Sequence, residues 1–214
     1  MQTYKIILKG GQGEIVEKKS RFIASLQPVS SEEEAAAFIE ATKKKYWDAR
    51  HNCTAMVIGR HAEITRCSDD GEPSGTAGRP MLEVLTGEGL RDVVVVVTRY
   101  FGGTLLGTGG LVRAYSQAVK EGLKNCEIGK LSEGRKVKLT MSYNDYGKVE
   151  HLCRTEGQEM EEVIYQENVT VVLTIPEQYY ESRIKKLQDA SAGRLAIEDL
   201  GPCTFLDKGG CDTL

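Results

Sequence analysis

The sequence has no long apolar run. Across its 214 residues, no stretch approaches the roughly 18–20 apolar residues that a membrane-spanning helix needs. The first twenty residues also lack an apolar segment followed by a small-residue cleavage site, so we expect no secretory signal. These absences predict a cytoplasmic protein that does not enter a membrane.

Cysteine and histidine patterns that hold metals or carry catalysis are missing as well. The six cysteines include no CxxC pair, and their irregular spacing indicates free thiols in a reducing compartment. The three histidines form no HxxxH or HExxH motif, and no GxSxG motif is present. We therefore expect no metal, no cofactor and no assignable catalytic residue.

The net charge is too small to indicate a nucleic-acid binder by itself. It is −3 for the whole chain, but its two parts differ. Residues 1–132 contain 18 Lys and Arg and 16 Asp and Glu, a net charge of +2, whereas residues 133–214 contain 10 and 15, a net charge of −5. If any part contacts a polyanion, we expect it to be the first.

The first part reads as strands interrupted by helices. The pattern predicts two extended segments around Lys18–Ser20, a helix over 30–49 with Ser30 or Ser31 as N-cap, strands over 53–59 and 62–68, and a short helix over 81–85 that ends at Gly87. Residues 93–97 are five consecutive valines, which favours a strand buried on both faces in the middle of a sheet. An amphipathic helix over 111–123 follows.

The second part has a different order of elements. Residues 129–136 are interpreted as a linker, and the remainder reads β-α-β-β-α-β, the order of a ferredoxin-like domain. We expect Asn144 to cap the first helix of this part and Pro176 to lie in the first turn of the second.

A glycine-rich segment, RYFGGTLLGTGGL, occupies residues 99–111. It fails the P-loop template, because Thr108 stands where GxxxxGK(S/T) needs lysine, and it fails GxGxxG, because Val112 stands at the last glycine. Two interpretations remain. The segment either seats an anion at a helix N-terminus or lets the helix pack closely on the sheet.

An acidic segment, DDGEPSGTAGRP, occupies residues 69–80. Asp69, Asp70 and Glu72 have the chemistry to bind a divalent cation or to serve as an acid–base pair, and Ser74 or Thr76 resembles a nucleophile without a base. The alternative is a turn at Asp70-Gly71 with Ser74 or Thr76 capping the next helix. The turn is favoured, as is a structural hydrogen bond for His51 over catalysis.

Together these motifs resemble a known family. HNCTAMVIG, SDDGEPSGTAGRPMLEVL and VVVVVTRYFGGTLLGTGGLVRAY, with the preceding KKSRFIASLQPV, resemble the IMPACT family in its bacterial, YigZ-like form. The resemblance implies an α+β protein of two domains, over residues 1–130 and 131–214. The first would resemble domain IV of elongation factor G, with a left-handed βαβ crossover, and the second its ferredoxin-like domain V.

The resemblance also implies an association with translation. We expect binding to RNA or the ribosome, with a translation-factor protein as a possible further partner. The alternatives are a hydrolase acting on a small phosphorylated or peptide-like substrate, and a protein-interaction module. The predicted anion-binding surface consists of Arg79, Arg99, Gly102, Gly103, Gly107, Gly109, Gly110 and Arg113. The family-motif loop adds His51, Asp69, Asp70, Gly71, Glu72, Pro73 and Thr76.

Overall fold

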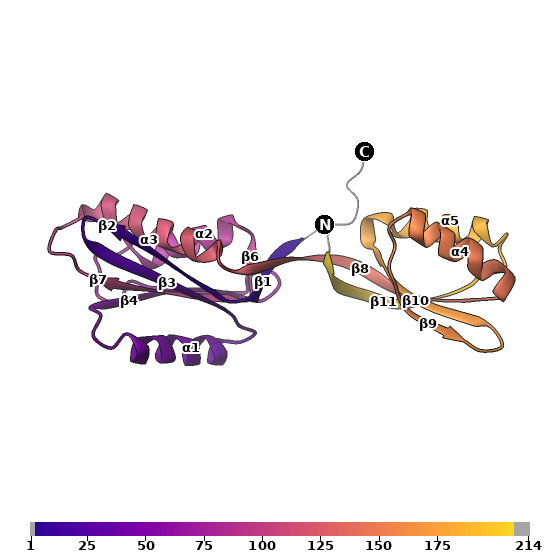
Figure 1. Ribbon diagram of the computed structural model, residues 1–214, viewed down its shortest axis with the longest axis horizontal. Helices are drawn as coiled ribbons and strands as arrows, with labels where there is room; N and C mark the ends of the chain where they lie inside the picture. Colours follow the sequence, from indigo (N-terminus) through magenta and orange to yellow (C-terminus); the bar gives the residue numbers. More distant parts are fainter. Residues whose placement is uncertain (1–2, 208–214) are drawn as a thin grey trace. The chain divides into compact units, whose positions relative to one another are not determined.

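The computed structural model describes residues 3–207 and divides into two compact units (Figure 1). Tyr4–Gly129 forms the first unit, and the described residues from Lys130 onward form the body of the second. Each unit combines a sheet with helices. The expected α+β class is confirmed.

The first unit is built on a five-stranded antiparallel sheet. Its spatial order is β2 (Gly11–Glu17), β3 (Ser20–Pro28), β7 (Val93–Tyr100), β4 (His51–Ile58) and β5 (Ile64–Ser68). A short parallel pair, β1 (Tyr4–Lys9) with β6 (Leu90–Arg91), also belongs to this unit. Since β3 and β4 both run antiparallel to β7, they run parallel to each other, and the helix between them makes a βαβ crossover.

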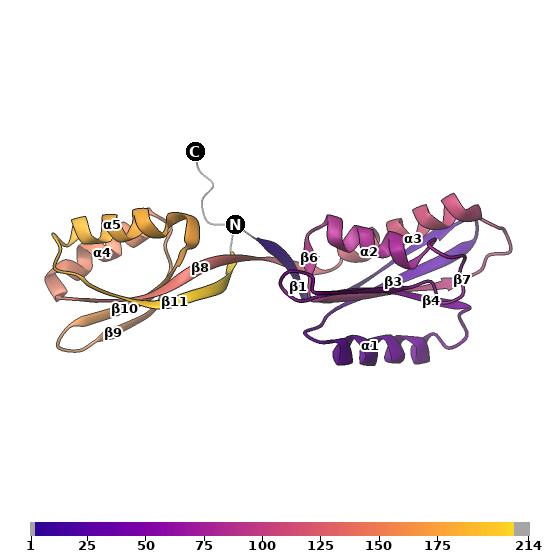
Figure 2. The ribbon, with the colours of Figure 1, turned by 180° about the vertical axis from the view of Figure 1, so that it is seen from behind.

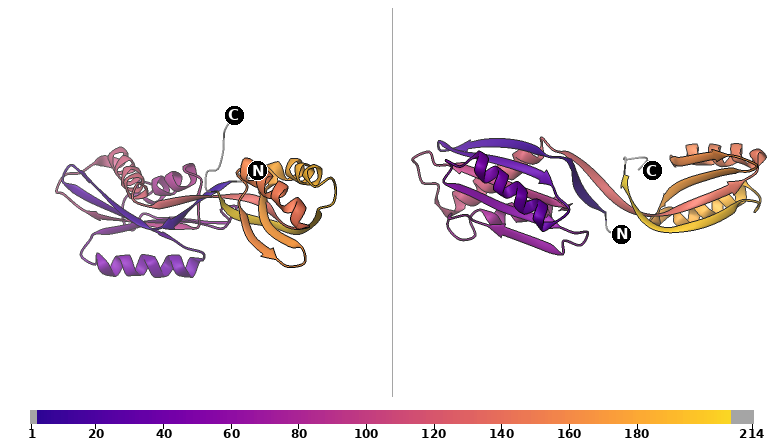
Figure 3. Two further views of the ribbon diagram at one scale, coloured as in Figure 1. Left: turned by 45° about the vertical axis from the view of Figure 1, so that its right-hand side comes forward. Right: turned by 90° about the horizontal axis from the view of Figure 1, so that it is seen from below.

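Helices cover both faces of this sheet (Figures 1 and 3). Helix α1 (Glu32–Lys45) lies on one face, and α2 (Gly78–Gly87) and α3 (Gly107–Leu123) lie on the other. Val93, Val95 and Val97 belong to the core beneath α2 and α3, whereas Val94 belongs to the smaller core beneath α1. The five valines do not alternate in polarity because both faces of β7 are buried, as predicted.

The second unit has the predicted β-α-β-β-α-β order. Its elements are β8 (Glu127–Met141), α4 (Tyr143–Thr155), β9 (Met160–Tyr165), β10 (Val169–Pro176), the short 3-10 helix η1 (Glu177–Tyr179), α5 (Tyr180–Ala190) and β11 (Ala196–Asp207). The strands lie in the order β9-β10-β8-β11, and α4 and α5 cover one face (Figure 2). This is the strand order of a ferredoxin-like sandwich.

Several local predictions were wrong. Residues 129–136 are not a linker but part of β8, which pairs with β11 from Lys130↔Asp207 onward. Ser142, not Asn144, caps α4 by accepting a hydrogen bond from the Asp145 backbone N–H. Pro176 ends β10 and precedes η1, so it lies outside α5.

Within residues 3–207, no helix is both long and apolar enough to cross a membrane.

Candidate functional site

The motifs of the first unit meet at one end of its sheet, which we call the loop end (Figure 1). The β2–β3 turn, the start of β4 and the end of β7 lie there, because Arg21 is paired with Tyr100 and His51 with Arg99. Strand β5 also ends there, at Ser68 opposite Thr54, so the 69–77 loop follows from the same end.

Asp69 holds the acidic loop against α2. One carboxylate oxygen accepts hydrogen bonds from the backbone N–H groups of Ala77 at 3.0 Å and Gly78 at 2.8 Å, and the other accepts from Gly75 at 2.8 Å. Burial opposes the charged form of Asp69, but the three N–H donors outweigh it and hold the pKa of this carboxyl below its usual range. Asp69 therefore caps α2, and the expected Ser74 or Thr76 cap is wrong.

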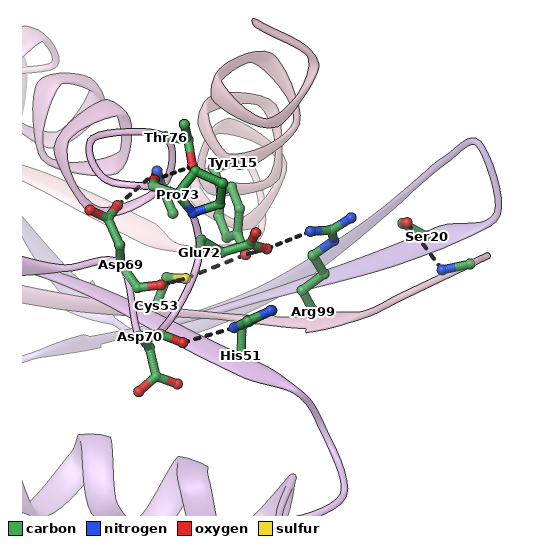
Figure 4. Close-up of polar contacts among 12 residues, drawn as sticks. Ser20, His51, Cys53, Asp69, Asp70, Glu72, Pro73, Thr76, Arg99 and Tyr115 are labelled. Carbon is green, nitrogen blue, oxygen red and sulfur yellow. Dashed lines mark hydrogen bonds and ion pairs between the residues drawn. The ribbon is translucent and has the colours of Figure 1, made fainter. Parts of the chain in front are cut away.

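Asp70 is turned toward a different face of the sheet from Glu72 (Figure 4). Its carboxylate accepts a hydrogen bond from the Asn52 backbone N–H at 2.7 Å and lies 3.7 Å from Lys43 Nζ on α1. His51 Nδ1 lies 2.8 Å from the Asp70 carbonyl oxygen, which only accepts, so Nδ1 donates. The favoured structural interpretation of His51 agrees with this contact.

Glu72 and Arg99 form a buried ion pair. They are 8% and 6% exposed, and Arg99 Nη1 donates to Glu72 Oε1 at 2.6 Å. The hydroxyl of Tyr115, on α3, donates to the same oxygen at 2.8 Å. Arg99 is therefore buried and already paired. Its assignment to the anion-binding surface was wrong.

Aromatic rings enclose this ion pair. The guanidinium of Arg99 lies 5.4 Å from the ring centroid of Phe22 and 5.6 Å from that of Phe101. Cys53 donates to the Tyr115 hydroxyl at 3.3 Å, and burial raises the pKa of the Cys53 thiol to about 12. A thiol with so high a pKa stays protonated and is a poor nucleophile.

The residues of the acidic loop thus have structural partners. Pro73 accepts a hydrogen bond from the Thr76 hydroxyl at 2.7 Å, and Gly71 has a φ of +86°, which glycine adopts without strain. Within the described part of the chain, no three His, Cys, Asp or Glu side chains are grouped to hold a metal ion. His51, Asp70 and Arg99 are each used in internal contacts, which disfavours the hydrolase hypothesis.

The glycine-rich segment divides into two parts with different roles. Gly102 packs against the β2–β3 turn, where an added Cβ would overlap the backbone of Lys19 and Ser20, and its N–H donates to Ser20 Oγ at 3.1 Å. Gly103 has a φ of +84° in the loop, and α3 begins at Gly107. The first turn of α3 contains no acidic residue and no side-chain cap, and nothing lies within 4 Å of a Cβ added at Gly109.

The two other predicted arginines are exposed, Arg113 on the second turn of α3 and Arg79 on α2 beside Glu83. Gly110 is half-buried, and a Cβ added there would lie 3.1 Å from Leu106 Cβ. The segment is therefore compatible with both interpretations. Gly102 makes the close packing contact, and the helix that starts at Gly107 has no side-chain cap and could seat an anion.

Sequence reasoning missed an exposed group at the loop end. Trp47 is 83% exposed, and Phe101 is 45% exposed. Among the described residues, the side chains of Lys18, Lys19, Lys44 and Arg50 are exposed and make no ion pair or hydrogen bond. Clustering of Lys with aromatics over 43–47 was the available signal.

Comparison with known proteins identifies the family. Residues 18–123 match the Impact N-terminal domain, and residues 139–194 match a domain of unknown function, DUF1949. IMPACT family member YvyE of Bacillus subtilis (strain 168) is 41% identical over 208 residues, covering 97% of this chain and 95% of that protein. The chain belongs to the IMPACT family.

Other relatives show how far the likeness extends. IMPACT family member YigZ of Escherichia coli (strain K12) is 37% identical to this family member, over 84% of this chain and 89% of that protein. Protein IMPACT-A of Xenopus tropicalis is 39% identical over 98 residues, only 44% of this chain and 30% of that protein. A solved structure, described as the crystal structure of a hypothetical protein, aligns with a TM-score of 0.59 at 35% identity over 92% of this chain and 97% of that one.

Proposed function

We propose that this IMPACT family member is a cytosolic, translation-associated protein that binds RNA or the ribosome through the loop end of its first unit and thereby modulates translation. The observation that supports this proposal most directly is a set of exposed cations at that end that have no acidic partner among residues 3–207. These are Lys18, Lys19, Lys44 and Arg50. Cations left free of ion pairs are available to phosphate.

The neighbouring groups suit a nucleic acid better than a small substrate. Trp47, three residues after Lys44, presents its indole to solvent, and exposed aromatic rings stack on unpaired bases. The uncapped start of α3 adds backbone N–H groups that favour an anion. Arg79 and Arg113 would extend this cationic surface along α2 and α3.

The sheet of the second unit differs from the loop end in how its lysines are paired. The sheet face away from α4 and α5 carries Lys136 paired with Glu161 and Lys138 paired with Glu198. Both of these lysines are already compensated by a carboxylate, unlike the lysines of the loop end. The first unit is therefore the better candidate for contact with RNA.

The test measures RNA binding by the full-length protein. Labelled single-stranded RNA is titrated at low salt, and sedimentation with ribosomes is followed in parallel. We expect Lys44→Gln/Arg50→Gln to weaken binding several-fold and to lower the salt slope by roughly 0.7 for each phosphate that the variant no longer neutralises.

Lys120→Gln/Lys185→Gln is the matched control, because it also removes two charges and both lysines are exposed and unpaired within the described chain, on α3 away from the loop end and on α5. It should bind RNA as tightly as the wild type. Absence of both RNA binding and ribosome sedimentation at low salt would refute the proposed function.

A further inference from the structure

The turn between β2 and β3 is formed by two lysines in an unusual conformation. Glu17 and Ser20 are paired in the β2–β3 register, so Lys18 and Lys19 alone reverse the chain. Their φ angles are +44° and +67°. Two consecutive left-handed residues are typical of a type I′ turn, for which Asn-Gly is strongly preferred.

Folding alone does not account for these lysines. Residues other than glycine, asparagine and aspartate occupy left-handed backbone at an energetic cost, so Asn-Gly would form the same turn more easily. Neither lysine gains an ion pair or hydrogen bond through its side chain in the described structure, and both side chains are exposed. Strained residues that persist without a structural gain are concentrated at functional sites.

The tip of the turn is also held in place. Gly102 packs directly against the backbone of Lys19 and Ser20, in a space that no side chain could share, and it donates a hydrogen bond to Ser20 Oγ. Next to the turn, Arg21 is bound to Glu14 at 2.7 Å and its guanidinium lies 6.0 Å from the Tyr100 ring centroid. A fixed backbone loses less entropy when the lysines engage a ligand.

We propose that the Lys18–Lys19 turn is a phosphate-contacting element whose ligand is the RNA backbone. The inference rests on the proposed function and assigns one of its contacts. Each ammonium group is a compact point charge that contacts phosphate without reading the base. The turn therefore contributes affinity that is independent of RNA sequence and strongly dependent on salt.

The experiment uses two variants of the full-length protein that separate charge from strain. Lys18→Asn/Lys19→Gly removes both, so we expect its thermal midpoint to rise by about 2–4 °C while RNA affinity falls. Lys18→Gln/Lys19→Gln removes the charge and keeps the strain, so it should lose the same affinity without the gain in stability. In both, the salt slope should fall by roughly 1.4, about 0.7 for each of the two charges removed.

The control is Lys9→Gln/Lys120→Gln, which removes two exposed, unpaired lysines of the same unit away from the loop end. Labelled single-stranded RNA is the probe, and an acidic peptide of equal charge is tested alongside. If the wild type binds no RNA, the proposed function fails. If the wild type binds RNA but the turn variants bind it as tightly as the wild type or the control does, the phosphate-contacting role is overturned. The same holds if the turn substitutions change binding of the acidic peptide but not of RNA.

Discussion

Arg99 and Glu72 are the most completely buried charged residues among those described in the first unit. Their charges are compensated by each other at 2.6 Å, with Tyr115 supplying a second donor to Glu72. Breaking a buried pair leaves one charge without compensation, which costs about 3–5 kcal/mol. We expect Glu72→Ala to lower the free energy of unfolding by that amount, measured by urea denaturation.

The double variant Glu72→Ala/Arg99→Met is the control for this prediction. It removes both charges and keeps an unbranched side chain between Phe22 and Phe101, so it should recover much of the loss. If Glu72→Ala and the wild type were equally stable, the Glu72–Arg99 ion pair would not stabilise the fold as predicted.

The sequence allowed the burial of Arg99 to be predicted, but not its pairing with Glu72. Side chains two apart on a strand share a face, so Arg99 follows Val93, Val95 and Val97 into the core beneath α2 and α3. Its burial was therefore open to prediction, although Arg99 was assigned to an exposed surface. Its partner Glu72 lies on a loop 27 residues away, and only the folded chain brings the two together.

At the scale of elements, α2 depends on a cap that comes from outside the helix. Asp69 accepts three backbone hydrogen bonds at the helix start, from Gly75, Ala77 and Gly78. We expect Asp69→Ala to cost roughly 2–3 kcal/mol at pH 7, since it removes a cap and charge-assisted hydrogen bonds. Ser74→Ala is the control and should be neutral, because Ser74 is exposed and donates no hydrogen bond in the described structure.

Acid provides an independent check of the same contact. The pKa of Asp69 is lower in the folded state than its usual value near 4, so its contribution to stability is complete above that value. The contribution disappears as the pH falls through the folded-state pKa. The difference in thermal midpoint between the wild type and Asp69→Ala should therefore be largest at pH 6–7 and shrink below about pH 4.

Elements with strong periodicity or capping signals were predictable, whereas those formed by long-range pairing were not. The helix over Glu32–Lys45 begins after its Ser31 cap and ends with three lysines, both visible in the sequence. Residues 129–136 are mostly polar and include two glycines, a composition that indicates a linker. They form a strand because β11, more than sixty residues later, supplies their hydrogen-bonding partners.

At the scale of the whole molecule, the buried side chains form distinct cores in the two units. Leu139 is completely buried in the core of the second unit, and Met81 is completely buried in that of the first. Each unit has its own hydrophobic core, which is the usual basis for separate folding units. The sequence indicated this division by its change in element order.

The proposed function places RNA binding in the first unit alone. Core substitutions in the two units should therefore affect RNA binding differently. Leu139→Ala should cost about 2–5 kcal/mol and lower the unfolding midpoint of the second unit by at least about 10 °C. Its RNA affinity, titrated below that transition, should equal that of the wild type. Met81→Ala should weaken the first unit instead, and its RNA binding should be lost at the lower temperature where that unit unfolds. A loss of RNA affinity in folded Leu139→Ala would show that the second unit contributes to the site.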